Sequence, residues 1–339
     1  MTPQAALHKL LEHADLTREE MLGVMRQIMN GDFTAVQIAG ILIALRMKGE
    51  TVDEIAAAAE VMRELSTKVK VAADAYLIDT CGTGGDGIQT FNVSTASAFV
   101  AAAAGAKVAK HGGRSVSSTC GSADVLEALG VNVSLTPDQV ARCVDEIGIG
   151  FMFAPNHHSA MKYAAPVRRE LGVRTLFNLL GPLTNPAGAK NQVLGVFDRA
   201  LTGKLAHVMQ RLGSRHVLVV HGSDGMDEIT FSGDTYVAEL KNGQVTEYSV
   251  NPQQFGMPLH KAEDIRVHNA EESKTMLLAV LQGQTGAARD IVLLNAGAAI
   301  YVAGVAESLA DGIEKAAQAI DDHSASAKLG QLVALSAES

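Results

Sequence analysis

The first seventy residues carry hydrophobic positions at helical spacing and show no strand-like alternation. Apolar residues between Val36 and Leu45 recur mostly at intervals of three or four. Three Thr-x-x-Glu/Gln pairs would each cap the start of a helix: Thr17 with Glu20, Thr34 with Gln37, and Thr51 with Glu54. Residues 1–70 are therefore predicted to form a small all-helical domain. Because a few short helices enclose little core, we expect this domain to bury a face against a second copy of the chain.

From residue 75 onward the pattern changes to alternating strands and helices. Strands are expected at 76–79, 131–135, 150–153, 193–197 and 216–220, with helices over 94–104 and from Pro137. Lys241-Asn242-Gly243 between alternating segments indicates a type I′ hairpin. Helices are also expected over 159–171 and 175–180, in an interlude near 157–186 that could pack on either part. The predicted fold class is α/β: the helical domain, then a larger α/β domain at 71–339 with a central mixed sheet flanked by helices.

Composition and charge narrow the function classes. The chain has 28 Lys and Arg against 37 Asp and Glu, a net charge of −9, so it lacks the basic field of a non-specific nucleic-acid or membrane-surface binder. The N-terminus does not resemble a signal peptide, and the apolar stretch 291–306 is shorter than the ~20 residues that span a bilayer. The three cysteines form no C-x-x-C pair, which favours reduced thiols. We expect a cytoplasmic protein without nucleic-acid or membrane partners.

A glycine-rich segment, Cys81-Gly-Thr-Gly-Gly-Asp-Gly87, directly follows a predicted strand. Residues without Cβ let backbone amides converge on an anion. The segment contains G-x-G-x-x-G, but a dinucleotide fold needs an acid ~20 residues later, and positions 104–110 hold none. A Walker-type loop does not fit either, because Ile88-Gln89 stand where Lys-Ser/Thr is required. An anion-binding loop of another kind is predicted.

Further anion-binding and metal-binding candidates follow along the chain. Asn92-Val-Ser-Thr95 stands at the start of a predicted helix. These residues could simply cap the helix, or they could form a second phosphate-binding site. The segment from Lys110 to Ser118 gathers two fixed cations, glycines and three hydroxyls, which favours anion binding. Asp227-Glu228 would more commonly be a solvated acidic turn, but beside two phosphate-type loops the pair indicates Mg²⁺. Zinc is not indicated, because the sequence has no Cys/His cluster and no H-E-x-x-H.

Taken in order, these and further motifs resemble the anthranilate phosphoribosyltransferase family, within the nucleoside phosphorylase-like transferases. The resemblance covers nearly the whole chain and rests on Gly82–Asp86, Asn92–Thr95, Lys110–Ser115, Gly121–Glu127, Phe153–Pro155, Val167–Leu171, Phe177–Pro186 and Asp227-Glu228. It implies transfer of phosphoribose from 5-phosphoribosyl 1-diphosphate (PRPP) to the amino nitrogen of anthranilate, a step of tryptophan biosynthesis. It also implies a homodimer formed through the helical domain, into which the interlude near 157–186 packs.

The resemblance further implies roles for individual residues. PRPP would be held by Gly82, Gly85, Asp86, Thr90, Asn92, Val93, Ser94, Thr95, Lys110, His111, Gly112, Gly113, Arg114, Ser115, Val116, Ser117, Ser118 and Ser122. Mg²⁺ would be bound by Ser94, Asp227 and Glu228, and anthranilate by Gly82, Gly113 and Arg168. These assignments fit the chemistry. Cleavage of the C1–diphosphate bond leaves negative charge that Mg²⁺ and Lys110 would offset, and a guanidinium fork reads a carboxylate.

One position departs from the family pattern, which usually has Asn where this chain has Gly113. One side-chain hydrogen bond to the acceptor is then missing, worth roughly 1 kcal/mol, so a paralogue that accepts another amine or phenol is one alternative. Another is a pyrimidine nucleoside phosphorylase, although Asp227-Glu228 speaks against it because phosphorolysis needs no metal-bound diphosphate. The net charge disfavours a non-catalytic nucleic-acid-binding relative, and the missing ribose-binding acid disfavours an NAD-dependent enzyme.

Overall fold

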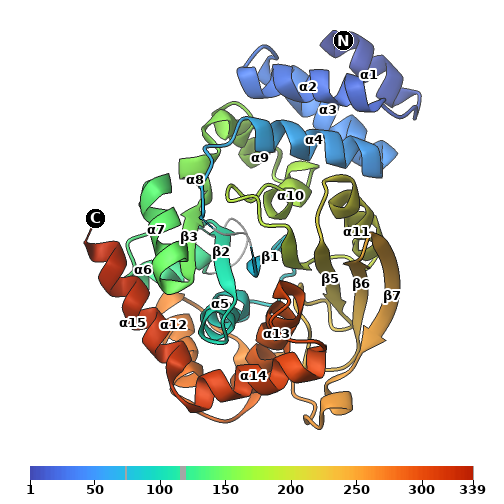
Figure 1. The fold of residues 1–339 in the computed structure, drawn as a ribbon. Helices are drawn as coiled ribbons and strands as arrows, with labels where there is room; N and C mark the ends of the chain where they lie inside the picture. Colours follow the sequence, from blue (N-terminus) through green and yellow to red (C-terminus); the bar gives the residue numbers. More distant parts are fainter. Residues whose placement is uncertain (73–74, 115–119, 339) are drawn as a thin grey trace.

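The N-terminal residues fold into a helical bundle. The computed structural model describes residues 1–72, 75–114 and 120–338. The bundle comprises α1 (Pro3–Leu11), α2 (Arg18–Asn30), α3 (Ala35–Lys48) and α4 (Val52–Glu64), and it lies at one end of the molecule (Figure 1). The three predicted capping boxes are confirmed: Thr17, Thr34 and Thr51 each accept a hydrogen bond from the third helical amide, whose side chain returns to the cap. These threonines fix where α2, α3 and α4 begin.

The described part of the remaining chain builds a seven-stranded sheet with the order β3-β2-β1-β4-β5-β6-β7. The strands are β1 (Leu77–Gly82), β2 (Lys107–Gly112), β3 (Ile149–Phe153), β4 (Asn191–Gly195), β5 (His216–Gly222), β6 (Thr235–Lys241) and β7 (Gln244–Val250). The strands from β3 to β5 in this order are parallel, whereas β6 and β7 pair antiparallel. Asn242 and Gly243 have φ values of 53° and 75°, as the predicted type I′ hairpin requires. The predicted fold class is confirmed.

Helices cover both faces of the sheet. Successive residues of its buried strands point to opposite sides, so apolar side chains on each face need a covering layer. Below the sheet in Figure 1 lie α5 (Val93–Ala103), α13 (Ala287–Ala303) and α14 (Leu309–Asp321). The same core includes residues of α6 (Ser122–Ala128), α7 (Pro137–Ile147), η4 (Ala262–Ile265), α12 (Ala270–Leu281) and α15 (Ser324–Ala337), with η3 (Pro252–Phe255) at its edge. A second core joins α11 (Leu201–Arg211), the other face of β4 to β6, and the helical bundle. Within the residues described, no helix has the length and apolar character needed to cross a membrane.

The interlude between β3 and β4 lies between the bundle and the sheet (Figure 1). It consists of short helices: α8 (Ala154–His157), η1 (Ser159–Lys162), α9 (Ala165–Leu171), α10 (Phe177–Leu180) and η2 (Gly181–Leu183). A continuous helix over 159–171 does not form, because Pro166 is tolerated only in the first turn of α9. Leu176, Phe177, Leu180 and neighbouring apolar residues share the core of the bundle helices.

The strand predicted at 131–135 is wrong. Val131, Val133 and Leu135 are buried at alternate positions, which produced the strand-like pattern. The backbone of this segment pairs with no strand among the described residues. Its amides bond locally and to α15 instead: Asn132 N donates to Ser336 Oγ at 3.1 Å, and Ser134 N to Asn132 Oδ1 at 2.9 Å. Alternating apolar residues show only that one side of a segment is buried. Here Ser336, near the end of α15, provides the hydrogen-bond partner of the Asn132 amide.

Candidate functional site

Several of the predicted site residues lie at the carboxyl edge of the parallel strands. The chain runs from β1 to β2 and β3 on one side and returns to β4 and β5 on the other, so the direction of strand addition reverses between β1 and β4. Ligands of open α/β sheets bind in the crevice that such a reversal creates. Gly82 at the end of β1 pairs in register with Gly195 at the end of β4, which places the glycine-rich loop directly at this crevice.

The glycine-rich loop is anchored at its start and open beyond it. Thr83 N donates to Gly195 O at 2.9 Å, and Gly84 N donates to Asp227 Oδ2 at 2.8 Å. Gly84, Gly85 and Gly87 have φ values of 67°, 79° and 79°, so successive amides can turn toward one side of the loop. The amides of Gly85, Asp86 and Gly87 have no hydrogen-bond partner among the described residues. Unpaired amides in this conformation are typical of a phosphate seat.

Asp227 lies so close to the ends of β1 and β4 that the strand residues facing it, Gly82 and Gly195, have no room for a side chain. A Cβ added at Gly82 would overlap the Asp227 carboxylate, and a Cβ added at Gly195 would overlap the Asp227 carbonyl oxygen. Both strand ends must therefore be glycine for the loop after β5 to sit across them. Sequence reasoning identified Gly82 but missed Gly195, for which a glycine ending a buried strand was the available signal.

The two acidic residues of this loop lie in a setting that disfavours ionisation without a cation. Both side chains are partly exposed at the crevice and surrounded by protein elsewhere. Burial, followed by the nearby Asp86 carboxylate, raises the pKa of Asp227 to about 7. Burial, followed by the charge of Asp227, raises the pKa of Glu228 well above its usual value, while Lys110 lowers it in part.

Lys110 and Ser94 complete the arrangement around Glu228. Lys110 is only 2% exposed, and its ammonium donates to Ser94 Oγ at 3.2 Å and to Thr80 O. Ser94 and Glu228 line one small cavity, and the Ser94 backbone amide lowers the pKa of Glu228 in part. Among the residues described, no three His, Cys, Asp or Glu side chains form a complete metal cage. Two carboxylates and a hydroxyl match an ion such as Mg²⁺, which takes its remaining ligands from water and substrate phosphates.

The segment after β2 is only partly engaged in this site. Arg114 points to α6, where its guanidinium bonds Glu127 at 2.5 and 2.7 Å and Asp124 at 2.9 Å. A phosphate group would have to compete with these carboxylates for the Arg114 guanidinium. Gly112 packs against Phe151 and Ser122, whereas a Cβ at Gly113 would meet no atom of the described residues within 4 Å. Ser115, Val116, Ser117 and Ser118 lie outside the described residues.

His111 stacks edge-on with His158 of the interlude, with ring centroids 5.1 Å apart. Burial, then the neighbouring histidines, lowers the pKa of His111 to about 3, and burial lowers that of His158 to about 4. Both rings are therefore neutral at pH 7. The Nε2 atoms of both have no partner among the described residues.

The remaining predicted donor-site residues have mainly structural contacts. Asn92 does not cap α5 with its side chain; Oδ1 accepts from Ser273 Oγ at 2.7 Å, and Nδ2 donates to Cys120 O at 3.2 Å. Thr90 forms an isolated antiparallel bridge with Arg266. Val93 is buried in the core, Thr95 is buried with an unpartnered hydroxyl, and Ser122 begins α6 beside Gly112.

Arg168 stands apart from the other cations of the site. It lies on α9, half-buried, with its guanidinium 5.5 Å from the Phe177 ring centroid. Its side chain makes no hydrogen bond or ion pair with the described residues, and burial lowers the pKa of its guanidinium. A desolvated cation without a partner favours an anionic ligand.

A buried carboxylate that sequence reasoning missed organises the floor of the site. Asp79 on β1 accepts from Asn185 Nδ2 at 2.8 Å and from His111 N at 3.1 Å. Burial raises its pKa, and the nearby Lys110 charge acts in the opposite direction. Asn185 comes from the end of the interlude, so this network joins β1, β2 and the interlude. An acid inside a predicted buried strand was the signal available for it.

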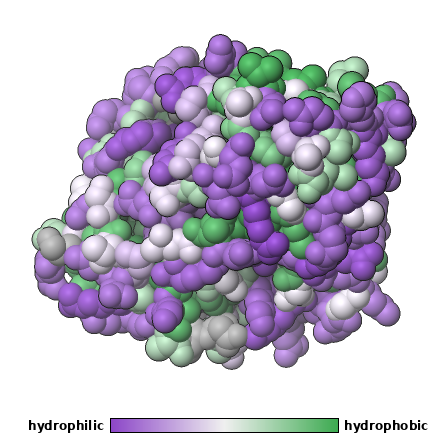
Figure 2. Space-filling model, turned by 90° about the horizontal axis from the view of Figure 1, so that it is seen from above, coloured by the Kyte–Doolittle hydropathy of each residue, from purple (hydrophilic) through white to green (hydrophobic). Residues whose placement is uncertain are grey.

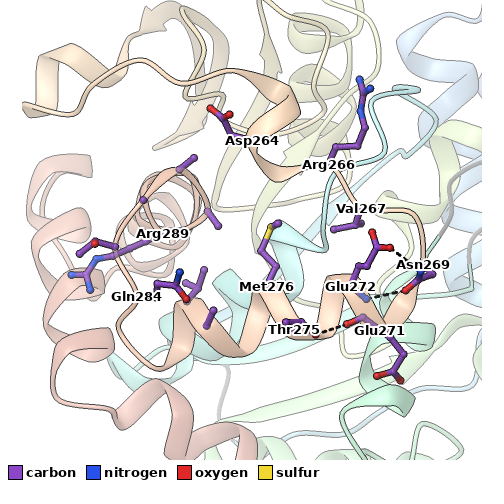
Figure 3. A pocket seen from close by; sticks show the side chains of 16 residues that line it. Asp264, Arg266, Val267, Asn269, Glu271, Glu272, Thr275, Met276, Gln284 and Arg289 are labelled. Carbon is purple, nitrogen blue, oxygen red and sulfur yellow. Dashed lines mark hydrogen bonds between the residues drawn. The ribbon is translucent and has the colours of Figure 1, made fainter.

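A separate cavity of about 710 Å³ lies beside Thr90, which pairs with the cavity residue Arg266 (Figure 3). It is bounded by α12, the segment 264–269 and the start of α13, and Glu271, Glu272, Met276 and Arg289 contribute side chains to its wall. Both acidic and basic groups line it, and it contains no predicted site residue. Gly82, Lys110 and Asp227 lie at the sheet-edge crevice rather than in this cavity.

Comparisons with known proteins agree with this geometry. Residues 74–326 match the model of the glycosyl transferase family a/b domain, and residues 4–66 match its helical bundle domain. The chain is 69% identical to an anthranilate phosphoribosyltransferase of Methylobacillus flagellatus and 64% identical to one of Laribacter hongkongensis, in each case covering 99% of this chain and 98% of the relative.

Solved structures show the same likeness over the full length. The anthranilate phosphoribosyltransferase of Thermus thermophilus superposes with a TM-score of 0.92 at 43% identity, covering 98% of this chain and 99% of that one. That of Saccharomyces cerevisiae, described in complex with PRPP and Mg, superposes with a TM-score of 0.90 at 26% identity, covering 99% and 98%.

Proposed function

Because this chain belongs to the anthranilate phosphoribosyltransferase family, we propose that its sheet-edge crevice performs the family's reaction with the residues described above. The chain is an enzyme: it transfers the 5-phosphoribosyl group of PRPP to the amino nitrogen of anthranilate, in tryptophan biosynthesis, and releases diphosphate. The observation that carries the residue assignment is the meeting of Gly82, Lys110 and Asp227 at the strand reversal.

The donor half of the site consists mainly of backbone and fixed charge. The unpaired amides of Gly85, Asp86 and Gly87 receive phosphate oxygens of PRPP, and Lys110 offsets charge that develops on the leaving diphosphate. Ser94, Asp227 and Glu228 would hold Mg²⁺, which supplies electrostatic stabilisation of the diphosphate. The donor set fits, since the raised pKa values of the two carboxylates report a site with too little positive charge.

The acceptor half orients a neutral amine. The aryl amine of anthranilate is a weak base, already unprotonated at pH 7, so it needs alignment with C1 more than a base before attack. Arg168 binds the anthranilate carboxylate, and Gly82 and Gly113 contribute backbone next to the ring. The unpartnered, half-buried guanidinium of Arg168 supports this role.

We further propose a homodimer through the helical bundle, in a cytoplasmic enzyme. Val36 and Met47 of α3 are 82% and 75% exposed, and half-buried Ile43 continues their stripe at helical spacing, with Leu11 of α1 nearby at 69%. Figure 2 views the molecule from the bundle end and shows apolar patches on a mostly hydrophilic surface. Val36→Glu combined with Met47→Glu should convert a dimer into a monomer in sedimentation experiments. A wild-type monomer would contradict this arrangement.

A coupled assay tests the proposed function. When purified enzyme is incubated with PRPP, anthranilate and Mg²⁺, the fluorescence of anthranilate should decrease as the substrate is converted. EDTA should stop the reaction. A parallel incubation with thymidine and phosphate distinguishes a nucleoside phosphorylase. Turnover only in that second incubation would overturn the proposal.

A further inference from the structure

The glycine-rich loop has a contact with the interlude that the proposed roles leave unexplained. Arg174 lies between α9 and α10, and its guanidinium donates to the carbonyl of Gly85. The same guanidinium stacks on Phe197, just after β4, with its central carbon 4.0 Å from the ring centroid. Arg174 therefore touches three separate segments: the donor loop, the end of β4 and, through its own backbone, the interlude.

The rest of the donor loop shows why this contact matters. Thr83 and Gly84 are held by Gly195 and Asp227, but Gly85 has no other hydrogen bond within the described residues. Because Gly85 has a φ of 79°, its peptide can rotate with little steric cost. A donor on the Gly85 carbonyl fixes the orientation of the following peptide, whose N–H belongs to Asp86. The Asp86 amide, one of those proposed to bind phosphate, is thus oriented from outside the loop.

Arg174 is suited to this task. A charge-assisted hydrogen bond is about twice as strong as a neutral one, and stacking on an aromatic ring holds a guanidinium in one plane. No carboxylate among the described residues pairs with Arg174. The contact also connects the loop with the segment that carries Arg168, six positions earlier, so the donor and acceptor halves share one support.

We propose that Arg174 is a positioning residue that holds the glycine-rich loop in its PRPP-binding conformation. The proposal rests on the proposed function, because it concerns how that donor site is preorganised. Arg174 acts through the Gly85 carbonyl and does not itself need to touch the substrate. Loss of the contact should weaken PRPP binding and leave anthranilate binding and the chemical step largely unchanged.

The test compares Arg174→Met with the wild-type enzyme. The KM for PRPP should rise about tenfold, as expected for one charge-assisted hydrogen bond, with kcat and the KM for anthranilate changed less than threefold. Calorimetric titration with PRPP and Mg²⁺ should show the same loss in affinity. Arg174→Lys, which keeps a charged donor, should recover most of it.

Arg199→Met provides the matched control. Arg199 also stacks on an aromatic ring, with its guanidinium carbon 3.6 Å from the Tyr236 centroid, but makes no contact with the loop among the described residues. Its kinetics should equal the wild type. If the wild type is active and the KM for PRPP is unchanged in Arg174→Met, the inference is overturned but the proposed function is not. An inactive wild type would instead remove the proposed function. Equal losses in kcat and melting temperature in both variants would indicate a purely structural role.

Discussion

The donor and acceptor halves of the crevice are built on different principles. The donor half relies on backbone amides, glycines that admit a carbonyl group, and carboxylates and a lysine fixed by the sheet. The proposed acceptor half relies chiefly on one side chain of the interlude, the half-buried Arg168 guanidinium, which has no hydrogen-bond or ion-pair partner among the described residues. In this proposal a highly charged donor is received by rigid, oriented groups. The smaller acceptor is selected by side chains that can vary independently of the sheet.

Removal of one carboxylate from the donor half should have the largest effect. Asp227→Asn retains the size of the side chain and an acceptor for Gly84 N, but it halves the carboxylate pair that would hold Mg²⁺. We expect kcat/KM to fall by about 10²–10³-fold in steady-state assays at high Mg²⁺. Asp234→Asn is the control and should retain full activity: Asp234 lies on the same β5–β6 connection, but among the described residues its side chain bonds only Asn251. Equal activities in both variants would remove Asp227 from the reaction.

Arg168→Ala examines the acceptor half in the same way. Loss of a guanidinium–carboxylate pair should raise the KM for anthranilate by about 10–100-fold and leave the KM for PRPP near its original value. Arg169→Ala, its exposed neighbour on α9, should behave like the wild type. An equal rise in both Michaelis constants would mean that the two halves are not separable as described.

The pKa of Asp227 predicts how Mg²⁺ should stabilise the protein at different pH values. Its folded-state pKa of about 7 lies above the ordinary 3.8, so without metal the stability contributed by this group is lost as pH rises from about 4 to about 7. Mg²⁺ requires the ionised carboxylates. Added Mg²⁺ with diphosphate should therefore raise the melting temperature by a few degrees more at pH 8 than at pH 5.5. In Asp227→Asn this pH dependence should be much reduced; an equal Mg²⁺ effect at both pH values in the wild type would contradict the assignment.

Gly113→Asn should give the smallest change, because it adds one neutral hydrogen bond. A Cβ at this position meets no atom of the described residues within 4 Å, so we expect the substitution to leave the backbone undisturbed. We expect the KM for anthranilate to fall about fivefold, corresponding to roughly 1 kcal/mol, with a narrower range of accepted anthranilate analogues. Identical acceptor profiles in the variant and the wild type would show that this side chain is not needed for acceptor binding.

Local signals predicted the fold well. The site assignments stay predictions, and the motifs of the donor half are more distinctive in the sequence than those of the acceptor half. Thr51 and Asn242-Gly243 specify their helix start and hairpin through contacts within a few residues, so the sequence carries that information directly. The glycine-rich loop is recognisable for the same reason. The segment 131–135 was mistaken for a strand because Ser336, which accepts from the Asn132 amide, is 204 residues away. Asp79, Gly195 and Arg174 acquire their importance only from contacts across the fold.

The overlap of the Asp227 carbonyl with the space above Gly195 restricts how this chain can diverge. Even alanine at position 195 would displace the loop that carries Asp227 and Glu228, so a methyl group on β4 would disturb both acids without altering either. Variation at that position is therefore tied to variation in the acidic pair. We expect a homologue with another residue in place of Gly195 to have lost the proposed magnesium ligands or to hold them differently. The presence of this glycine should therefore indicate that a homologue depends on the metal.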